Sequence, residues 1–597
     1  MSKPKLTPEE YLVKYRESGR NIVGTYIKGK GTSFIIPDDD KLPQSMDVVN
    51  IADRGQTVIS STISGMKVVA TFAANDKLNI TEVLGLPSKV GTDVLGVIRR
   101  FNLDEQFPSE VTAEASRVAK IEKCEIERRE DLREKLLITI DPEDAKDLDD
   151  AVSLEQNPDG TYELGVHIAD VSHYVQEGSE LDAEAFNRGT SVYFPGGVIP
   201  MLPPVLSNSI CSLEANQDRL ALSCFMKIDS KGQVLESRIA ETVIHVDTRF
   251  SYMQVQAILD GEGKTTKPIK AMLETMASLT MTLERIRKKR GEVTLDIPEP
   301  KIILDPVTGK IKDVIAYPHL LAHRIIETFM ILCNETIAEY ALEHSLPFVY
   351  RIHEKPDPLK VTRLVEMLKP FGVFHNISPE NPTGHAYQKL LEGLKQNSQG
   401  EDESAAIRHI VSHLALRSMQ KAKYDPECKG HFGLGSKFYC HFTSPIRRLP
   451  DLIIHRIIKF MLNRKLSSHK IAELTEYVKL VSAQSIKTEL TATEVEREVD
   501  NLKRAEFMLD HIGEKFTGTI SGIMEFGVFV YLPNTVEGLC KIENLPKEGR
   551  EFYRFNEKNC TMASGRRTFK MGDKIEVVCV AVNMTRRQIE FSANFDS

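Results

Sequence analysis

The chain has 597 residues and a formal net charge of −8 at pH 7. This length exceeds what one hydrophobic core supports, so about three or four domains are expected. There is no long apolar run and no hydrophobic signal region at the N-terminus, which argues against a membrane protein and predicts a cytoplasmic location. The nine cysteines are scattered without a CxxC pair, which indicates reduced core residues. Negative net charge argues only weakly against nucleic acid as a partner, because binding depends on where positive charge lies.

The N-terminal part predicts a small β-barrel. Residues 1–18 form a polar helix or arm, and residues 19–105 contain short strand-like runs separated by Gly, Pro and Asp turns. Tyr26 and Phe34 lie in two of these runs. The region resembles a cold-shock (OB-type) barrel, which implies that these rings stack on nucleobases; the alternative is that they fill the barrel core, and the sequence leaves both interpretations open. A charged connector follows over residues 106–131.

The most informative segment is an acidic loop between two apolar, strand-like runs. It places six carboxylates in the ten residues 141–150, DPEDAKDLDD. Two like charges about 4 Å apart repel by roughly 4 kcal/mol at an effective dielectric of about 20, so a fold that gathers several of them needs a compensating cation. A hard divalent metal such as magnesium prefers oxygen ligands and commonly shares its site with phosphate. The loop therefore predicts metal-assisted phosphoryl chemistry.

Two other interpretations of this loop are weaker. A solvated acidic loop is the usual explanation of an acidic run, but the apolar flanks argue against it here. A calcium-binding EF-hand loop, counted from Asp141, requires Gly at its sixth position and Glu at its twelfth. The sequence has Lys146 and Val152 there.

The loop opens a predicted catalytic domain that spans residues 132–512. The turn signal NPDG at 157–160 predicts a hairpin, which would place the acidic loop on a strand next to the one that carries His167 and Asp170. Helices are predicted over 320–343, over 451–462 after Pro450, and over 471–509 before Gly513.

The last domain, residues 513–597, returns to strand-like patterns and predicts a second barrel. The segment 516–530 resembles the RNA-binding OB barrel first named from ribosomal protein S-one, and this resemblance implies that three aromatic side chains, Phe516, Phe526 and Phe529, stack on nucleobases at about 1–3 kcal/mol per base. The alternative is that at least one of them belongs to the barrel core.

Five segments in order resemble the RNB family of ribonucleases, the group that contains ribonuclease II and ribonuclease R. They are TIDPEDAKDLDDAV at 139–152, VHIADVSHYV at 166–175, YFPGG at 193–197, IPMLP at 199–203 and TSPIRR at 443–448. The resemblance runs from about residue 20 to the C-terminus and lies closest to a shortened ribonuclease R-like member. It implies a multidomain α+β protein, whose RNB catalytic domain has a mixed sheet with surrounding helices. A cold-shock-like OB barrel precedes that domain and an S-one-type OB barrel follows it.

The resemblance also implies roles for individual residues. Four aspartates are similar to the family's active-site set that holds magnesium, or manganese, against the scissile phosphate: Asp141, Asp147, Asp149 and Asp150. Arg447 resembles the active-site arginine, whose planar fork suits the charge that develops on phosphate. Asp149 and Arg447 are thus the expected catalytic pair.

Further residues of the matched motifs are expected to bind RNA or to support the site. Tyr193 resembles the tyrosine that stacks on the 3′-terminal nucleotide, and Arg448 is expected to contact RNA beside Arg447. Glu496 aligns with a glutamate that the family has near the exit of its catalytic channel for RNA. His167 and Asp170 are expected to support the site, because a strand histidine is more often a satisfied core group than a catalyst.

The sequence therefore predicts a processive 3′-to-5′ exoribonuclease that degrades single-stranded RNA to 5′-mononucleotides and works as a monomer on RNA 3′ ends, with no membrane partner. The competing hypothesis is a catalytically silent RNA-binding or regulatory protein on the same scaffold. The complete aspartate set with Arg447 argues against it. Whether the end product resembles that of ribonuclease II or of ribonuclease R is left open.

Overall fold

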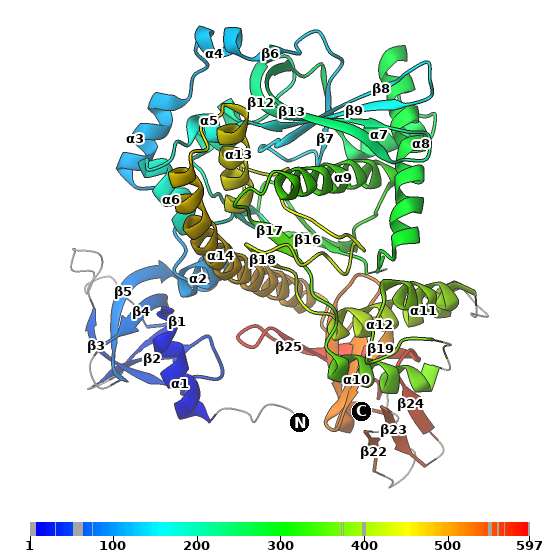
Figure 1. Cartoon of the computed structure of the whole chain (residues 1–597). Helices are drawn as coiled ribbons and strands as arrows, with labels where there is room; N and C mark the ends of the chain where they lie inside the picture. The colour runs from blue at the N-terminus through cyan, green and yellow to red at the C-terminus, as the bar shows by residue number, and fades with distance from the viewer. Residues whose placement is uncertain are drawn as a thin grey trace.

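The structure is a computed structural model, which describes residues 7–29, 32–51, 64–73, 76–295, 297–371, 373, 375–396, 401–546, 552–557, 560–565 and 567–594. The chain forms a barrel near each end of the sequence and a larger domain between them that contains a seven-stranded sheet (Figure 1). This arrangement confirms the predicted fold class. Within the described residues, no helix is long and apolar enough to cross a bilayer.

The N-terminal barrel closes in the order β1-β2-β3-β5-β4. Its strands are β1 (Ile22–Lys28), β2 (Ser33–Pro37), β3 (Met46–Ile51), β4 (Lys67–Phe72) and β5 (Leu78–Gly85). Helix α1 (Pro8–Glu17) begins with a capping box formed by Thr7 and Glu10. Tyr15 of this helix is 4 % exposed and belongs to the barrel core, so the predicted N-terminal arm is a helix packed on the barrel.

The two candidate aromatic residues of this barrel differ. Tyr26 is 3 % exposed, lies in the barrel core, and donates a hydrogen bond to Ser33 Oγ at 2.9 Å. The interpretation of Tyr26 as a base-stacking residue is therefore wrong, because its ring lies on the inward face of β1 and its hydroxyl is already satisfied. Phe34 is half-buried, and its contact with RNA stays a prediction.

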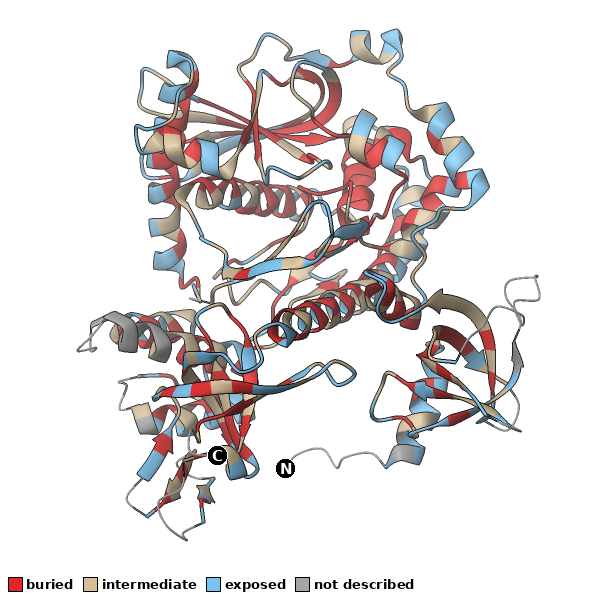
Figure 2. Cartoon of the chain, turned by 180° about the vertical axis from the view of Figure 1, so that it is seen from behind, coloured by how far each residue is buried: buried red, intermediate tan, exposed pale blue. Residues whose placement is uncertain are grey.

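Three helices connect this barrel to the central domain: α2 (Thr92–Arg100), α3 (Ser109–Val118) and α4 (Lys123–Arg128). Val111 and Ala115 of α3 belong to the core of the central domain, whereas α4 buries no residue. Figure 2 shows this contrast between the buried centre and the exposed outer helices. The connector is thus largely helical and partly packed.

The central sheet is mixed and has the strand order β14-β7-β8-β9-β12-β13-β6. The edge strands β14 and β6 pair in parallel with their neighbours, and the strands between them are antiparallel. The strands are β6 (Glu130–Asp131), β7 (Ile138–Asp141), β8 (Asp150–Gln156), β9 (Tyr162–Ala169), β12 (Asp218–Ile228), β13 (Val234–His245) and β14 (Thr248–Ser251). The predicted hairpin at 157–160 joins β8 to β9 and places Asp150 opposite Ile168.

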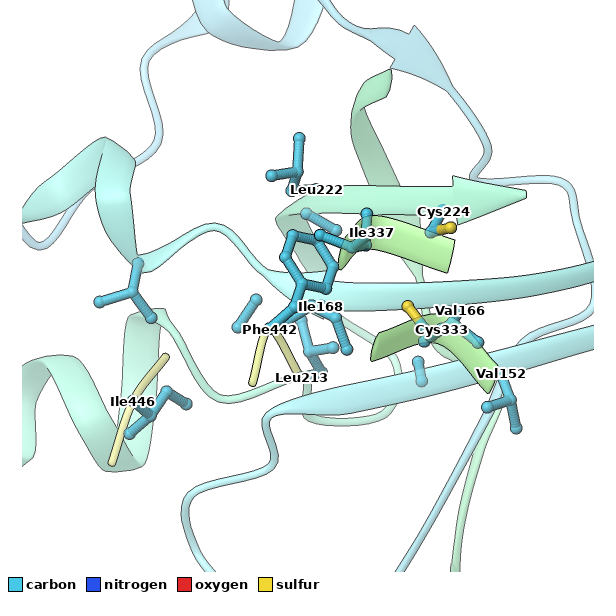
Figure 3. Close-up of a cluster of buried hydrophobic side chains, with 14 of the residues drawn as sticks. Val152, Val166, Ile168, Leu213, Leu222, Cys224, Cys333, Ile337, Phe442 and Ile446 are labelled. Carbon is cyan, nitrogen blue, oxygen red and sulfur yellow. The ribbon is translucent and has the colours of Figure 1, made fainter. Parts of the chain in front are cut away.

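Helices pack against this sheet and form one continuous core with it. Figure 3 shows part of the core, where Phe442 lies in the same cluster as Ile168 and Ile337. Cys224 and Cys333 are buried and free in this cluster, as expected of reduced core cysteines. The three predicted helices are confirmed, since the structure contains α9 (Leu321–Glu343), α13 (Leu449–Leu462, with Pro450 in its first turn) and α14 (Ser468–Leu509).

The central domain also contains further helices and three two-stranded pairs. The helices are α5 (Val171–Tyr174), α6 (Glu180–Arg188), the π-helix η2 (Leu206–Ile210), α7 (Tyr252–Leu259), α8 (Lys267–Arg290), α10 (Pro358–Leu368), η3 (Lys369–Phe371), α11 (Gly384–Gln396) and α12 (Glu401–Ser418). The two-stranded pairs are β10 (Val192–Phe194) with β11 (Gly197–Ile199), β15 (Pro300–Leu304) with β16 (Ile311–Ala316), and β17 (Tyr350–Ile352) with β18 (Lys423–Asp425).

The C-terminal barrel closes in the order β19-β20-β21-β26-β25. Its strands are β19 (Lys515–Met524), β20 (Gly527–Tyr531), β21 (Glu537–Lys541), β25 (Lys574–Asn583) and β26 (Gln588–Ser592), with η4 (Ile542–Asn544) and a small sheet of β22 (Arg554–Asn556), β23 (Thr561–Ser564) and β24 (Arg567–Lys570) between β21 and β25. Phe507 and Met508 of α14 and Val314 of β16 belong to the barrel core. The barrel is therefore joined to the central domain by shared apolar packing.

Candidate active site

The acidic loop crosses from the end of β7 to the start of β8, so Asp141 closes one strand and Asp150 opens the next. The loop is held by hydrogen bonds to its backbone. Ser212 Oγ accepts from the Leu148 N–H at 3.2 Å and donates to the Lys146 carbonyl at 2.8 Å. Arg249 Nη2 donates to the Ala145 carbonyl at 2.7 Å. These contacts order the loop without neutralising its carboxylates.

The carboxylates destabilise one another in their ionised forms. Burial raises the pKa of Asp141 well above its usual range, and the charge of Asp150 raises it further. Burial also raises the pKa of Asp149 well above its usual range and that of Asp150 to about 6. One oxygen each of Asp141 and Asp149, Oδ2 in both, is buried without a hydrogen-bond partner. The loop thus holds more negative charge than its surroundings compensate.

Arg447 reaches this cluster from a distant part of the sequence. Its Nε lies 3.8 Å from Asp149 Oδ2, and Asp149 Oδ1 accepts a hydrogen bond from the Ile446 N–H at 2.9 Å. Arg447 Nη2 also donates to Ser444 Oγ at 3.0 Å. The side chain of Arg447 remains 42 % exposed. The two residues expected to form the catalytic pair are therefore adjacent, and the guanidinium is still accessible.

Arg448 has a different environment from its neighbour. Its Nη2 donates to Asp451 Oδ1 at 2.7 Å, and the same oxygen accepts from the Ser444 N–H at 2.8 Å. Asp451 is fully buried in the first turn of α13. Arg448 therefore holds the turn that presents Arg447, and its contact with RNA stays a prediction.

Tyr193 lies on β10 and faces the acidic loop. Its hydroxyl donates a hydrogen bond to the Asp147 carboxylate, and its backbone N–H donates to Glu496 Oε1 of α14 at 3.0 Å. The residue is 38 % exposed, and Gly196 turns the hairpin with a φ of +90°. The structure thus brings Tyr193 and Glu496 to the aspartates, as the sequence motifs predict.

Two residues of the matched motif at 166–175 are buried and have a structural role. His167 is fully buried between Ser153 Oγ at 3.0 Å and Ser223 Oγ at 2.7 Å, and burial lowers its pKa to about 3. Asp170 is fully buried and accepts hydrogen bonds from Arg129 and Lys459. Both residues have the structural role expected of them.

Sequence reasoning missed Tyr252, which lies close to the carboxylates. Burial and the charges of Asp150 and Asp141 raise its pKa, and its ring stacks on His323 with centroids 4.0 Å apart. The preceding residue, Ser251, pairs with Asp141 across the parallel strands β14 and β7. No spacing in the sequence signals this contact, because the two strands lie more than a hundred residues apart along the chain.

The aspartates suit a divalent cation by their chemistry. Carboxylate oxygens are the ligands that magnesium and manganese prefer, and two of these oxygens are buried without partners. Over the described part of the chain, however, no three His, Cys, Asp or Glu side chains are already grouped to hold one ion. The donor set fits the ion, and binding would draw the carboxylates together.

The C-terminal barrel presents two of its three candidate phenylalanines together. Phe526 is 55 % exposed, and its ring lies 6.2 Å from that of Phe529 at an interplanar angle of 85°. Phe516 is half-buried against the barrel core. Phe526 is therefore the exposed ring of an aromatic pair whose other member, Phe529, is half-buried, as is Phe516.

Comparisons with known proteins agree with this geometry. Residues 129–464 match the RNB domain and residues 509–594 match the S1 RNA binding domain. The chain is 37 % identical to ribonuclease R of Thermotoga maritima, over 98 % of this chain and 82 % of that protein. It is 35 % identical to ribonuclease R of Escherichia coli K12, over 96 % of this chain and 70 % of that protein.

Solved structures show the same similarity. Mycoplasma genitalium RNase R in complex with ribose methylated single-stranded RNA superposes with a TM-score of 0.85 at 25 % identity, over 96 % of this chain and 89 % of that chain. Yeast Ssd1, described as a pseudonuclease, has the same fold at a TM-score of 0.68 and 19 % identity, over 92 % and 67 % of the two chains. On the RNB match over more than half of its length and the near full-length identity to ribonuclease R, the chain belongs to the RNB family of ribonucleases.

Proposed function

We propose that the protein is a processive 3′-to-5′ exoribonuclease that hydrolyses single-stranded RNA to 5′-mononucleotides with magnesium or manganese, as a cytoplasmic monomer. One observation carries the proposal: three segments far apart in the sequence meet at the acidic loop, where Arg447 lies beside Asp149 and Tyr193 donates a hydrogen bond to Asp147.

The residues have separable tasks in this mechanism. The ring of Tyr193 stacks on the 3′-terminal base and places the last phosphodiester over the acidic loop. The guanidinium of Arg447 donates to the phosphate oxygens and stabilises the charge that develops as water attacks in line. Magnesium held by Asp141, Asp147, Asp149 and Asp150 would neutralise phosphate charge and stabilise the attacking and leaving oxygens.

The barrels supply the other half of the proposal. The exposed ring of Phe526 and the half-buried ring of Phe529 beside it offer a stacking surface that does not depend on base identity. Such a surface gathers single strands upstream of the 3′ end, so the enzyme keeps its substrate between successive cuts. This retention is the physical basis for processivity.

A gel of products from a 5′-labelled single-stranded RNA tests the proposal. We expect shortening from the 3′ end with magnesium or manganese, none with a chelator, and one short end product even when excess unlabelled RNA is added after binding. The length of that product also decides between ribonuclease II-like and ribonuclease R-like behaviour. Internal cuts would contradict an exonuclease. Binding without any cleavage would support the silent scaffold, for which the fold of the pseudonuclease Ssd1 provides a structural precedent.

A further inference from the structure

The hairpin β10–β11, which carries Tyr193, packs against the helices α2 and α14. Val192 and Ile199 are 4 % and 3 % exposed and lie in one apolar cluster with residues of α2 and α14. The members from these helices are Val94, Val97, Ile98, Ala492, Val495, Val499 and Leu502, with Phe101 at the end of α2. Phe194, next to Tyr193, packs against the same cluster. We call this group the clamp cluster.

The C-terminal barrel also reaches the clamp cluster. The turn between β25 and β26 places Met584 against it. Figure 1 shows β25 extending from the C-terminal barrel toward the N-terminal barrel, close to α14. Arg586 in the same turn lies 3.5 Å from Asp40 of the N-terminal barrel. Parts of all three domains therefore meet behind the tyrosine.

An ionic contact fastens this turn in place. Glu498 of α14 accepts a hydrogen bond from Arg587 Nη1 at 2.6 Å and forms an ion pair with Arg100 of α2. The side chains of Arg100, Arg587 and Glu498 are only 8 %, 16 % and 23 % exposed. One carboxylate thus joins two guanidiniums of different domains where water is largely excluded, so its loss would leave buried positive charge less well compensated.

We propose that Met584 and Glu498 are positioning residues for Tyr193, so that the packing of the two barrels sets how short an RNA the enzyme can still hold. Met584 fills the clamp cluster behind the hairpin, and Glu498 keeps the turn that carries Met584 against it. When either contact is lost, β10–β11 gains freedom, the ring of Tyr193 is less well placed on the terminal base, and short fragments leave sooner. This inference rests on the stacking role assigned to Tyr193 in the proposed function.

Three variants of one turn test the proposal on the full chain. Met584→Ala should lengthen the end product by one or more nucleotides and raise KM for short oligonucleotides, with little change of kcat on long RNA. Met584→Leu, which keeps apolar volume, should restore the wild-type product. Thr585→Ala changes an exposed residue of the same turn and is the matched control. Glu498→Gln should change the product in the same direction as Met584→Ala.

A double-mutant comparison distinguishes action through Tyr193 from a general effect. In a Tyr193→Ala background, Met584→Ala should cause no further lengthening, because the ring that it positions is absent. Equal lengthening in both backgrounds, or an unchanged product in the wild-type background, would overturn the proposal. Wild-type enzyme on the same gel reports separately on the proposed function, since that function fails only if the wild type does not shorten the RNA.

Fluorescence gives a readout that does not depend on activity. The chain contains no tryptophan, so Tyr193→Trp introduces a single emitter at the clamp. Adding Met584→Ala should shift its emission to the red and increase quenching by acrylamide, whereas adding Thr585→Ala should change neither. Identical spectra in the presence and absence of Met584→Ala would show that Met584 does not position the hairpin.

Discussion

At the scale of single residues, the aspartates of the loop are not equivalent. Asp149 accepts the Ile446 N–H and lies beside Arg447, so its charge is partly compensated by the protein. Burial raises the pKa of Asp141 and that of Asp150, and the charge of Asp150 raises the pKa of Asp141 further. Asp149 therefore joins the acidic loop to the turn that carries Arg447, and all three carboxylates keep a raised pKa that a bound cation would lower.

Asp149→Asn should abolish turnover and leave RNA affinity nearly unchanged. The amide oxygen can still accept the Ile446 N–H, so the local fold is kept, while the negative charge beside Arg447 is lost. Single-turnover cleavage with magnesium and binding in chelator measure the two effects. A variant that keeps more than about a tenth of the wild-type rate would remove Asp149 from the catalytic set, because that loss corresponds to only about 1.4 kcal/mol.

Asp150→Asn should stabilise the cation-free protein near neutral pH. Burial raises the folded-state pKa of Asp150 to about 6, above the ordinary value of 3.8 for an aspartate side chain. The stability linked to its protonated form is therefore complete below pH about 4 and is lost as the pH rises through about 6. Near pH 7.5 the ionised carboxylate opposes folding by about 3 kcal/mol, since the pKa rises by roughly two units and each unit corresponds to about 1.4 kcal/mol.

Thermal unfolding in chelator at pH about 5 and about 7.5 checks this sign, because the gain from Asp150→Asn should be larger at the higher pH. Magnesium should raise the Tm of the wild type more at the higher pH and raise that of the variant less. A variant that is less stable than the wild type in chelator at the higher pH would contradict the prediction.

Arg447→Lys keeps the charge but loses the bidentate fork of the guanidinium. If Arg447 stabilises the charge that develops on the phosphate, the catalytic rate should fall by a factor on the order of 100 or more with little change in binding. Single-turnover rates with saturating enzyme measure this loss. An unchanged rate would mean that Arg447 serves only its ion pair with Asp149.

At the scale of elements, the site is assembled by three backbone features. The acidic loop crosses between neighbouring strands, the turn at 443–448 is fixed by Asp451 at the start of α13, and the hairpin β10–β11 leans on α14 through Glu496. Each feature presents one chemical group at a defined place. The hairpin is the element whose function is simplest to isolate.

Tyr193→Ala should lengthen the final product by one or more nucleotides while cleavage continues. Stacking on the terminal base is worth about 1–3 kcal/mol, so its loss releases short fragments sooner. Tyr193→Phe is the matched control, because it keeps the ring and removes only the hydrogen bond to Asp147. If the alanine variant ends at the wild-type length, the clamp lies elsewhere.

At the scale of the whole molecule, the C-terminal barrel is not a detachable module. Phe507, Met508 and Val314, which lie outside residues 513–597, belong to its core, so deletion of this barrel would expose apolar surface of α14 and β16. Its contribution to RNA binding is therefore better tested by surface substitutions than by truncation.

The double variant Phe526→Ala/Phe529→Ala should bind long single strands more weakly, by about 1–3 kcal/mol for each lost stacking contact. The salt dependence of binding should not change, because no cationic group is removed. Cleavage of a short oligonucleotide at saturation should remain at the wild-type rate. Val580→Ala, an exposed apolar residue on β25, is the control. Undiminished affinity would show that the barrel gathers RNA by another surface.

The sequence by itself determined which residues form the acidic loop, the two barrels and the helices α9, α13 and α14. These features depend on local spacing: carboxylates within ten residues, alternation along strands, and capping residues at helix ends. The family motifs added Arg447 and Tyr193, which the structure does place at the loop. Local pattern could not say which side of a strand faces a barrel core, so the role of Tyr26 stayed open until its burial was known.

Only the tertiary structure decided which distant segments meet. The position of Tyr252 near the carboxylates follows from the parallel pairing of the edge strand β14 with β7, and the contact of Met584 with the clamp cluster follows from the docking of three domains. Such contacts are fixed by the packing of whole elements, which no short window of sequence encodes. The candidate catalytic residues can therefore be identified from the sequence, whereas the contacts that position them are determined only by the tertiary structure.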